Sequence, residues 1–231
     1  MTISQIRRFR DEGVVILPGV FNQHTVTELQ AHVSMVKSCL EVGVLSRDSR
    51  FVIGPLPDFL CNMYGWPEFR EPVQDLLNTS SVALYSSRLL LKDDEFSGAV
   101  EIHQDAPYFT GGKRKISAFV PLAPMRADDG GLCFVKGSHK YGVLERGVIQ
   151  LDKFPPMEHL RPDLEPGDVV LMDFLTWHYS GPCSSERPLM QITFQPATDG
   201  SYCDLPGPTL VSGQWQTSYF VKKGECVKPD A

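Results

Sequence analysis

The stretch Arg187-Pro188-Leu189-Met190-Gln191-Ile192-Thr193-Phe194 alternates residue by residue, and this alternation decides the fold class. In a β-strand, successive side chains point to opposite faces of the sheet. One face carries Arg187, Leu189, Gln191 and Thr193, and the other carries Pro188, Met190, Ile192 and Phe194. A strand with one apolar and one mixed face is typical of an antiparallel sheet. We expect the apolar face to pack on helices and the polar face to line a cavity.

The rest of the chain places helices first and strands later. The predicted strands are 82–91, 99–105, 115–122, 131–136, 168–173 and 188–195, with one early strand at 14–17. The predicted helices run from the cap Ser4 through Arg10, over 23–41 with Asn22 as the cap, and over 66–77, whereas 46–57 is expected to be irregular. Because strands and helices do not alternate, the order argues against a parallel βαβ sheet. It favours a mainly β fold, an antiparallel jelly-roll barrel with N-terminal helices on one outer face.

The length of 231 residues suits a single domain. We expect a helical support region at 1–80, a jelly-roll core at 81–197, and a tail at 198–231 that serves as a lid or a subunit contact. The net charge of −6 argues against nucleic acid or an anionic membrane as the main partner.

No apolar stretch is long enough for a signal peptide or a membrane span. The chain is therefore expected to be soluble and cytoplasmic, as a monomer or homodimer, with its six cysteines as free thiols.

The segment Glu101-Ile102-His103-Gln104-Asp105 carries the first chemical signal. His103 and Asp105 are two residues apart, so on an extended strand an imidazole and a carboxylate point to the same side and can converge on one metal ion. His178 would supply a third ligand, although only the fold can bring it near. Arg187 would then clamp an anion beside the metal. This donor set indicates a mononuclear non-haem iron oxygenase.

Several segments together resemble the phytanoyl-CoA dioxygenase family of iron(II)/2-oxoglutarate oxygenases. The central one is His103-Gln104-Asp105-Ala106-Pro107-Tyr108. Before it stand Asp11-Glu12-Gly13-Val14-Val15-Ile16-Leu17-Pro18-Gly19-Val20-Phe21 and Leu89-Leu90-Leu91-Lys92; after it stand Asp129-Gly130-Gly131-Leu132, Lys136-Gly137-Ser138-His139, Pro166-Gly167-Asp168-Val169-Val170-Leu171 and His178-Tyr179-Ser180-Gly181-Pro182. A single His-x-Asp is weak, but these segments in the family's order are specific.

The resemblance implies a double-stranded β-helix with Fe(II) held by His103, Asp105 and His178 at one open end. It implies 2-oxoglutarate and O2 as co-substrates, with succinate and CO2 as products. Arg187 would bind the distal carboxylate of 2-oxoglutarate, although many relatives place this arginine two residues later, where this chain has Leu189. Further residues that match positions near the co-substrate are Arg88, Phe119 and Ser180.

Asp105 also separates reaction types within this resemblance. Halogenating relatives carry a small residue at this position, which leaves room for a halide on the metal. We therefore expect hydroxylation or another oxidation of a small molecule, such as a natural product or an amino-acid-like compound. The alternative from another class is a jelly-roll protein that binds a metal or small anion without oxygen chemistry.

Overall fold

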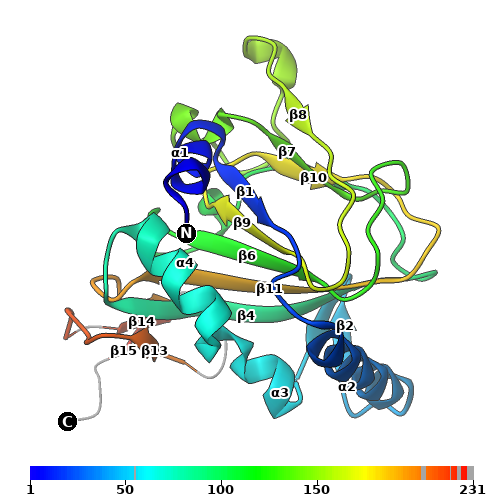
Figure 1. Cartoon of the computed structure of the whole chain (residues 1–231). Helices are drawn as coiled ribbons and strands as arrows, with labels where there is room; N and C mark the ends of the chain where they lie inside the picture. The colour runs from blue at the N-terminus through cyan, green and yellow to red at the C-terminus, as the bar shows by residue number, and fades with distance from the viewer. Residues whose placement is uncertain (55, 204–206, 219, 223–224, 228–231) are drawn as a thin grey trace.

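The computed structural model describes residues 1–54, 56–203, 207–218, 220–222 and 225–227. Helices lie mostly in the first third of the chain (Figure 1). They are α1 (Ile3–Glu12), α2 (Gln23–Glu41), α3 (Asp58–Cys61) and α4 (Pro67–Leu77), with 3₁₀ turns η1 (Asn62–Gly65), η2 (Ala106–Tyr108), η3 (Ser138–Tyr141) and η4 (Leu151–Lys153). None of the helices in the described part of the chain has the length and apolar character needed to cross a membrane.

A large antiparallel sheet forms the centre of the molecule. Along its path the strands follow the order β1 (Val14–Leu17), β9 (Val169–Asp173), β6 (Ile116–Pro121), β11 (Arg187–Pro196), β4 (Val82–Lys92), β3 (Phe51–Ile53) and β2 (Ser46–Asp48). β11 lies between β6 and β4, with Gln191 opposite both Phe119 and Arg88. The strand that decided the fold class in the sequence therefore runs through the middle of the sheet.

A smaller antiparallel sheet lies on the other side of the large sheet from α2 and α3, and α1 lies near it (Figure 1). Its order is β5 (Val100–His103), β10 (His178–Ser180), β7 (Leu132–Val135) and β8 (His159–Leu160). The two sheets form the predicted jelly-roll arrangement, but among the described residues they are not hydrogen-bonded into a closed barrel. The predicted fold class is confirmed, with an open rather than a closed arrangement of the sheets.

The main hydrophobic core fills the space between the large sheet and the helices. Met190, Ile192 and Phe194 point from β11 into this core and are fully buried. They meet Leu29 of α2 and Phe69 of α4. The predicted packing of the apolar face of β11 on helices is confirmed. A second cluster, which includes Val14, Phe119, Phe134, Val170 and Leu189, fills the space between the two sheets.

The helix predictions hold with one correction. α2 begins after the N-cap Asn22, whose side chain accepts a hydrogen bond from the backbone N–H of Thr25 at 3.0 Å. α1 is capped by Thr2 rather than Ser4, because the Thr2 hydroxyl and the Gln5 side chain form a reciprocal capping box. α1 ends at Gly13, which has φ of 80° and lies so close to Thr176 and His139 that a Cβ atom would clash.

The predicted irregular segment 46–57 was wrong in part, because β2 and β3 form a short hairpin there and join the edge of the large sheet. The tail also contains strands that the sequence did not predict. They are β12 (Ser201–Tyr202), β13 (Thr209–Ser212), β14 (Phe220–Lys222) and β15 (Glu225–Val227). β13 pairs with β4, and β12 pairs in parallel with β14. Among the described residues, Cys39, Cys133, Cys183 and Cys203 take part in no disulfide.

Candidate metal and co-substrate site

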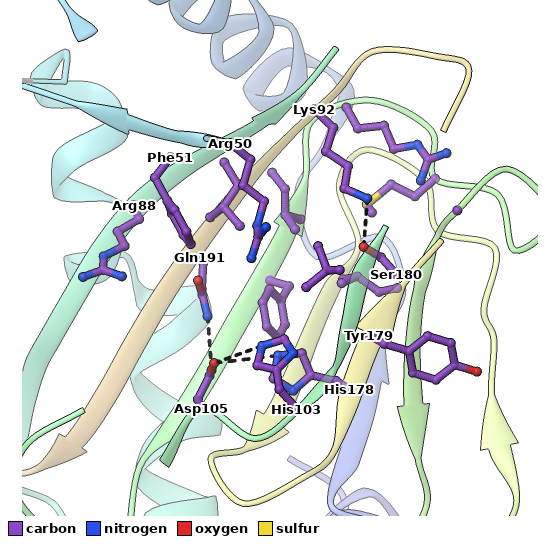
Figure 2. Close-up of a pocket in the computed structure, with 18 of the residues that line it drawn as sticks. Arg50, Phe51, Arg88, Lys92, His103, Asp105, His178, Tyr179, Ser180 and Gln191 are labelled. Atoms are coloured by element: carbon purple, nitrogen blue, oxygen red, sulfur yellow. Dashed lines mark hydrogen bonds and ion pairs between the residues drawn. The ribbon is translucent and has the colours of Figure 1, made fainter. Parts of the chain in front are cut away.

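Three predicted ligands converge between the sheets at one end of the smaller sheet. His103 ends β5 and His178 begins β10, and the two residues are direct partners across the antiparallel ladder. Their ring centroids are 4.3 Å apart. Asp105 lies just beyond β5, and its Oδ1 is 3.8 Å from the Nε2 atom of each histidine (Figure 2). Among the described residues, this is the cluster of histidine, cysteine and carboxylate side chains whose ligand atoms could hold a metal ion.

The hydrogen bonds of the two histidines aim the same ring atom inward. Nδ1 of His103 donates to the carbonyl oxygen of Glu101 at 2.7 Å, and Nδ1 of His178 donates to that of Thr176 at 3.1 Å. These bonds fix the tautomer, so the lone pair of each Nε2 atom faces the cluster. Burial, with the adjacent His178 ring as a second cause, lowers the pKa of His103 to about 4. The imidazole is therefore neutral near pH 7, the form that binds metals.

The remaining oxygen of Asp105 is held from the large sheet. Oδ2 accepts a hydrogen bond from Nε2 of Gln191 at 3.3 Å and lies 3.5 Å from the hydroxyl of Ser117. Oδ1 is left facing the two histidines. The three ligand atoms lie within 4.8 Å of one another. Donors bound at about 2.1 Å and at right angles would be about 3 Å apart, so the ligand atoms would approach one another by about 1 to 2 Å to hold a transition metal. Two imidazoles and a carboxylate on one side leave the opposite coordination positions open, the arrangement typical of non-haem iron.

Two buried cations lie in the cavity that adjoins this cluster. Lys92 of β4 is 8% exposed. Its Nζ donates to the Ser180 hydroxyl at 3.0 Å (Figure 2) and to the Gly181 carbonyl at 2.8 Å. In the described part of the chain, no carboxylate lies within ion-pair distance of it. Burial lowers the pKa of Lys92, and the charges of Arg187 and Arg50 add to this effect.

Arg187 is the second inner cation and is 2% exposed. Its Nη2 lies 3.0 Å from Oδ2 of Asp129. The pKa of Asp129 is held well below its usual range, mainly by the backbone N–H of Ser184 and the hydroxyl of Ser185. The contact with Arg187 is close but poorly aligned, because Nε, Nη1 and Nη2 are all buried without a hydrogen-bond partner among the described residues. Unpaired buried donors of this kind indicate space for a bound acceptor.

The other residues expected near the co-substrate also line this cavity. Arg88, Phe119 and Ser180 all contribute to its wall. Arg88 additionally donates to the sulfur of Cys203 at 2.9 Å. The ring of Phe119 lies 6.1 Å from that of His178, centroid to centroid. The alternation of β11 is also confirmed on this side, because Arg187, Leu189 and Gln191 all face the cavity.

The sequence interpretation missed two cavity residues, Arg50 and Lys92. Lys92 could have been found, because the alternation that put Arg88 on the cavity side of β4 extends through Leu90 to Lys92. Arg50 gave no such signal. It occupies the turn between β2 and β3, where each strand has only three residues.

Sequence similarity to known proteins covers most of the chain. The family model for phytanoyl-CoA dioxygenase matches residues 9–189. A curated relative, the 1-deoxypentalenic acid 11-beta-hydroxylase of Streptomyces arenae, is 29% identical over 149 residues, which is 56% of this chain and 52% of the relative. The match thus spans about half the length of that relative.

Solved structures share the fold at low sequence identity. The non-haem alpha-ketoglutarate-dependent epimerase SnoN from nogalamycin biosynthesis aligns with a TM-score of 0.73 and 21% identity over 85% of this chain and 83% of its own. EctD from S. alaskensis, solved with 2-oxoglutarate and 5-hydroxyectoine, aligns with a TM-score of 0.72 and 20% identity over 85% and 77%. The carbocyclase SnoK from nogalamycin biosynthesis gives 0.71 and 18% over 87% and 86%.

Proposed function

Because this chain belongs to the phytanoyl-CoA dioxygenase family, we propose that it is an Fe(II)- and 2-oxoglutarate-dependent dioxygenase that oxidises a small molecule. The observation that carries the proposal is the convergence of His103, Asp105 and His178, with both Nε2 atoms and one carboxylate oxygen directed at a common point. When bound there, iron with 2-oxoglutarate and O2 supplies an oxidant that removes hydrogen from a C–H bond, and succinate and CO2 are released.

The protein's own part is to hold the ligands and keep one side of the metal open. The carbonyl groups of Glu101 and Thr176 keep the imidazole protons on Nδ1. Gln191 turns the Asp105 carboxylate so that one oxygen faces the metal position. Asp105 occupies the position that a halide would need, so the proposal is hydroxylation or a related oxidation rather than halogenation.

The distal carboxylate of 2-oxoglutarate is assigned to the inner end of the cavity. Arg187 offers buried N–H groups that have no hydrogen-bond partner among the described residues, and Lys92 offers an Nζ that donates to the neutral oxygens of Ser180 and Gly181. Ser180 can turn its hydroxyl from Lys92 toward the carboxylate. Many relatives place the arginine that binds this carboxylate two residues later in the strand than Arg187. We propose that Lys92, the direct partner of Arg187 across β4 and β11, supplies the second positive charge that compensates for this shift. Arg88 and Phe119 complete the wall of the co-substrate cavity.

The substrate is proposed to be a small organic molecule of the natural-product type. The curated relative is named for hydroxylation of 1-deoxypentalenic acid, and two of the structural neighbours belong to nogalamycin biosynthesis. We keep a single domain over residues 1–231, a location in the cytoplasm, and a monomer or homodimer as predictions, together with the role of the tail as a lid or subunit contact.

The proposal is tested by turnover of the co-substrate. Purified protein with Fe(II), 2-oxoglutarate and O2 should form succinate slowly even without a substrate. We expect His103→Ala to lower this rate by about 100-fold or more, because a missing ligand weakens the metal site. His24→Ala is the matched control, since His24 is an exposed histidine of α2 that pairs with Glu28. Wild-type succinate formation by His103→Ala would refute the assignment.

A second measurement distinguishes the enzyme from a protein that merely binds a metal or an anion. Under anaerobic conditions, a 2-oxo acid chelated to Fe(II) gives a visible charge-transfer band, whereas a structural metal does not. We expect the band in the wild type and its loss in His178→Ala. Product analysis with chloride present should show oxygenated and no chlorinated product.

A further inference from the structure

A second hollow opens over the metal cluster on the side away from Lys92 and Arg187. Its volume is about 480 Å³, large enough for a molecule with several rings. The wall contains the turn and strand residues Arg50, Phe51 and Arg88 on one side and Tyr108, Phe109 and Arg146 on the other. His103 and Asp105 border it as well, so a molecule in this outer hollow would lie against the metal position.

The charges of the outer hollow are predominantly positive. Its lining holds Arg50, Arg88 and Arg146 against Glu101 and Asp105, and Asp105 faces the proposed metal. Arg88 is engaged with Cys203, and the exposed Arg146 stacks on the Tyr108 ring at 4.8 Å.

Among the arginines of the outer hollow, Arg50 has a charge that acts on the His103 ring. Figure 2 shows its side chain directed toward His103 from above, beside Gln191. It lines both the outer hollow and the inner cavity. Within the described residues, no carboxylate lies within ion-pair distance of its guanidinium, which instead lies 5.0 Å from the Phe51 ring. The Asp105 carboxylate acts on Arg50 only through space, and burial outweighs it and lowers the pKa of Arg50. A half-buried guanidinium with an aromatic neighbour and no direct ion pair among the described residues is arranged to receive an anion.

Apolar residues form part of the remaining outer wall, beside the polar groups of Glu101, His103 and Tyr108. Phe51 and Phe109 provide ring faces, and Val100, Ile102 and Val148 provide aliphatic surface. Such walls favour a hydrocarbon body, and a single cation near the reacting position fixes its orientation.

We propose that the substrate is an organic anion, an apolar ring or chain body with one acidic group that pairs with Arg50. This inference rests on the proposed function, since it treats the outer hollow as the substrate position of a dioxygenase. The inner cations are already assigned to the co-substrate, and neither Lys92 nor Arg187 lines the outer hollow. Arg50 is therefore a specificity residue for a second anion.

The test uses two fluorescent probes that share a ring system and differ in charge. 8-Anilinonaphthalene-1-sulfonate is an anion, and N-phenyl-1-naphthylamine is its neutral counterpart. Both are titrated into protein loaded with Mn(II) and 2-oxoglutarate. We expect the anion to bind about tenfold more tightly than the neutral probe, as a charge-assisted contact predicts. Arg50→Gln should abolish this preference, and Arg50→Lys, which keeps the charge, should retain most of it.

Two controls show whether the preference belongs to Arg50 and to the outer hollow. Arg126→Gln removes a surface arginine that pairs with Glu165 and should leave the preference unchanged. The dissociation constant for 2-oxoglutarate, measured by calorimetry, should change less than about threefold in Arg50→Gln. A large loss of 2-oxoglutarate affinity in this variant would assign Arg50 to the co-substrate and overturn the inference.

The inference that Arg50 pairs with the acidic group of the substrate would also be overturned by any of three results. These are equal binding of the two probes, binding of neither probe, and an unchanged preference for the anion in Arg50→Gln. Failure of the proposed function is detected separately. In that case the Fe(II)-loaded wild type would show no charge-transfer band with 2-oxoglutarate, whatever the probes do.

Discussion

Lys92 and Arg187 face each other across two strands and show how much the surroundings of a residue decide its role. Both are buried cations, yet Arg187 has an acidic neighbour in Asp129, whereas Lys92 donates to the oxygens of Ser180 and Gly181 and forms no ion pair with a described carboxylate. Burying an ammonium group without a counter-charge is costly. A dicarboxylate in the cavity would relieve this cost, so the inner end of the cavity is arranged for an anion.

We predict that Lys92→Met raises the dissociation constant for 2-oxoglutarate by about 10- to 100-fold, the range expected for loss of one charge-assisted contact. The methionine keeps most of the side-chain volume. Isothermal titration of the Mn(II)-loaded protein measures the change, with Lys37→Met as the control, because Lys37 is a surface residue paired with Glu186. Wild-type affinity in Lys92→Met would mean that Arg187 holds the carboxylate alone.

Single residues were predictable where a short local rule applied to them. The two-residue spacing placed His103 and Asp105 together, and their side chains do converge. Phe119 and Ser180 line the cavity as expected from the resemblance. Arg50 could not be predicted, because its position depends on a long-range contact in which its carbonyl accepts the N–H of Leu91.

At the level of elements, long alternating strands were predictable and short ones were not. β11 and β6 each separate a helix-facing side from a cavity-facing side, and both patterns were visible in the sequence. β2, β3 and β10 have three residues each, too few for a period of two to stand out. Their pairing depends on neighbouring strands.

We predict that Ile192→Ala lowers the free energy of unfolding by about 2–5 kcal/mol, because it leaves a cavity in a fully buried position of β11. Ile192→Val is the matched control and should cost about 1 kcal/mol. Urea denaturation measures both. The affinity of Ile192→Ala for 2-oxoglutarate should remain that of the wild type under native conditions, since Ile192 faces the helices. A stability loss no larger than that of the valine variant would contradict this packing.

At the scale of the whole molecule, one buried lysine connects the start of the tail to the large sheet. Nζ of Lys115, just before β6, lies 2.7 Å from Oδ2 of Asp199 and 3.1 Å from the Ser201 hydroxyl, and it also donates to Gln195. Burial lowers the pKa of Lys115 to about 8, although Asp199 opposes the shift. Burial alone would raise the pKa of Asp199, but Lys115 and Ser201 bring it below its usual value.

The lowered pKa of Lys115 gives stability a defined pH dependence. Between about pH 8 and the usual 10.5 of lysine, the unfolded chain binds more protons at this position than the folded chain. The free energy of unfolding therefore rises with pH in this window. We predict that the wild type gains about 1–2 kcal/mol relative to Lys115→Met between about pH 7.5 and 9.5, as measured by urea denaturation. A constant or shrinking difference would show that Lys115 titrates near its ordinary value.

His103 and His178 are direct partners in the pairing of β5 with β10, so formation of the proposed metal site depends on the register of these two strands. A slip of β5 against β10 by a single residue would turn one of the two rings to the opposite side of the sheet. The other histidine and Asp105 would then be left without the third donor. We therefore expect a newly made chain to complete the proposed metal site in the same event that pairs β5 with β10 in this register, however well the helices have docked.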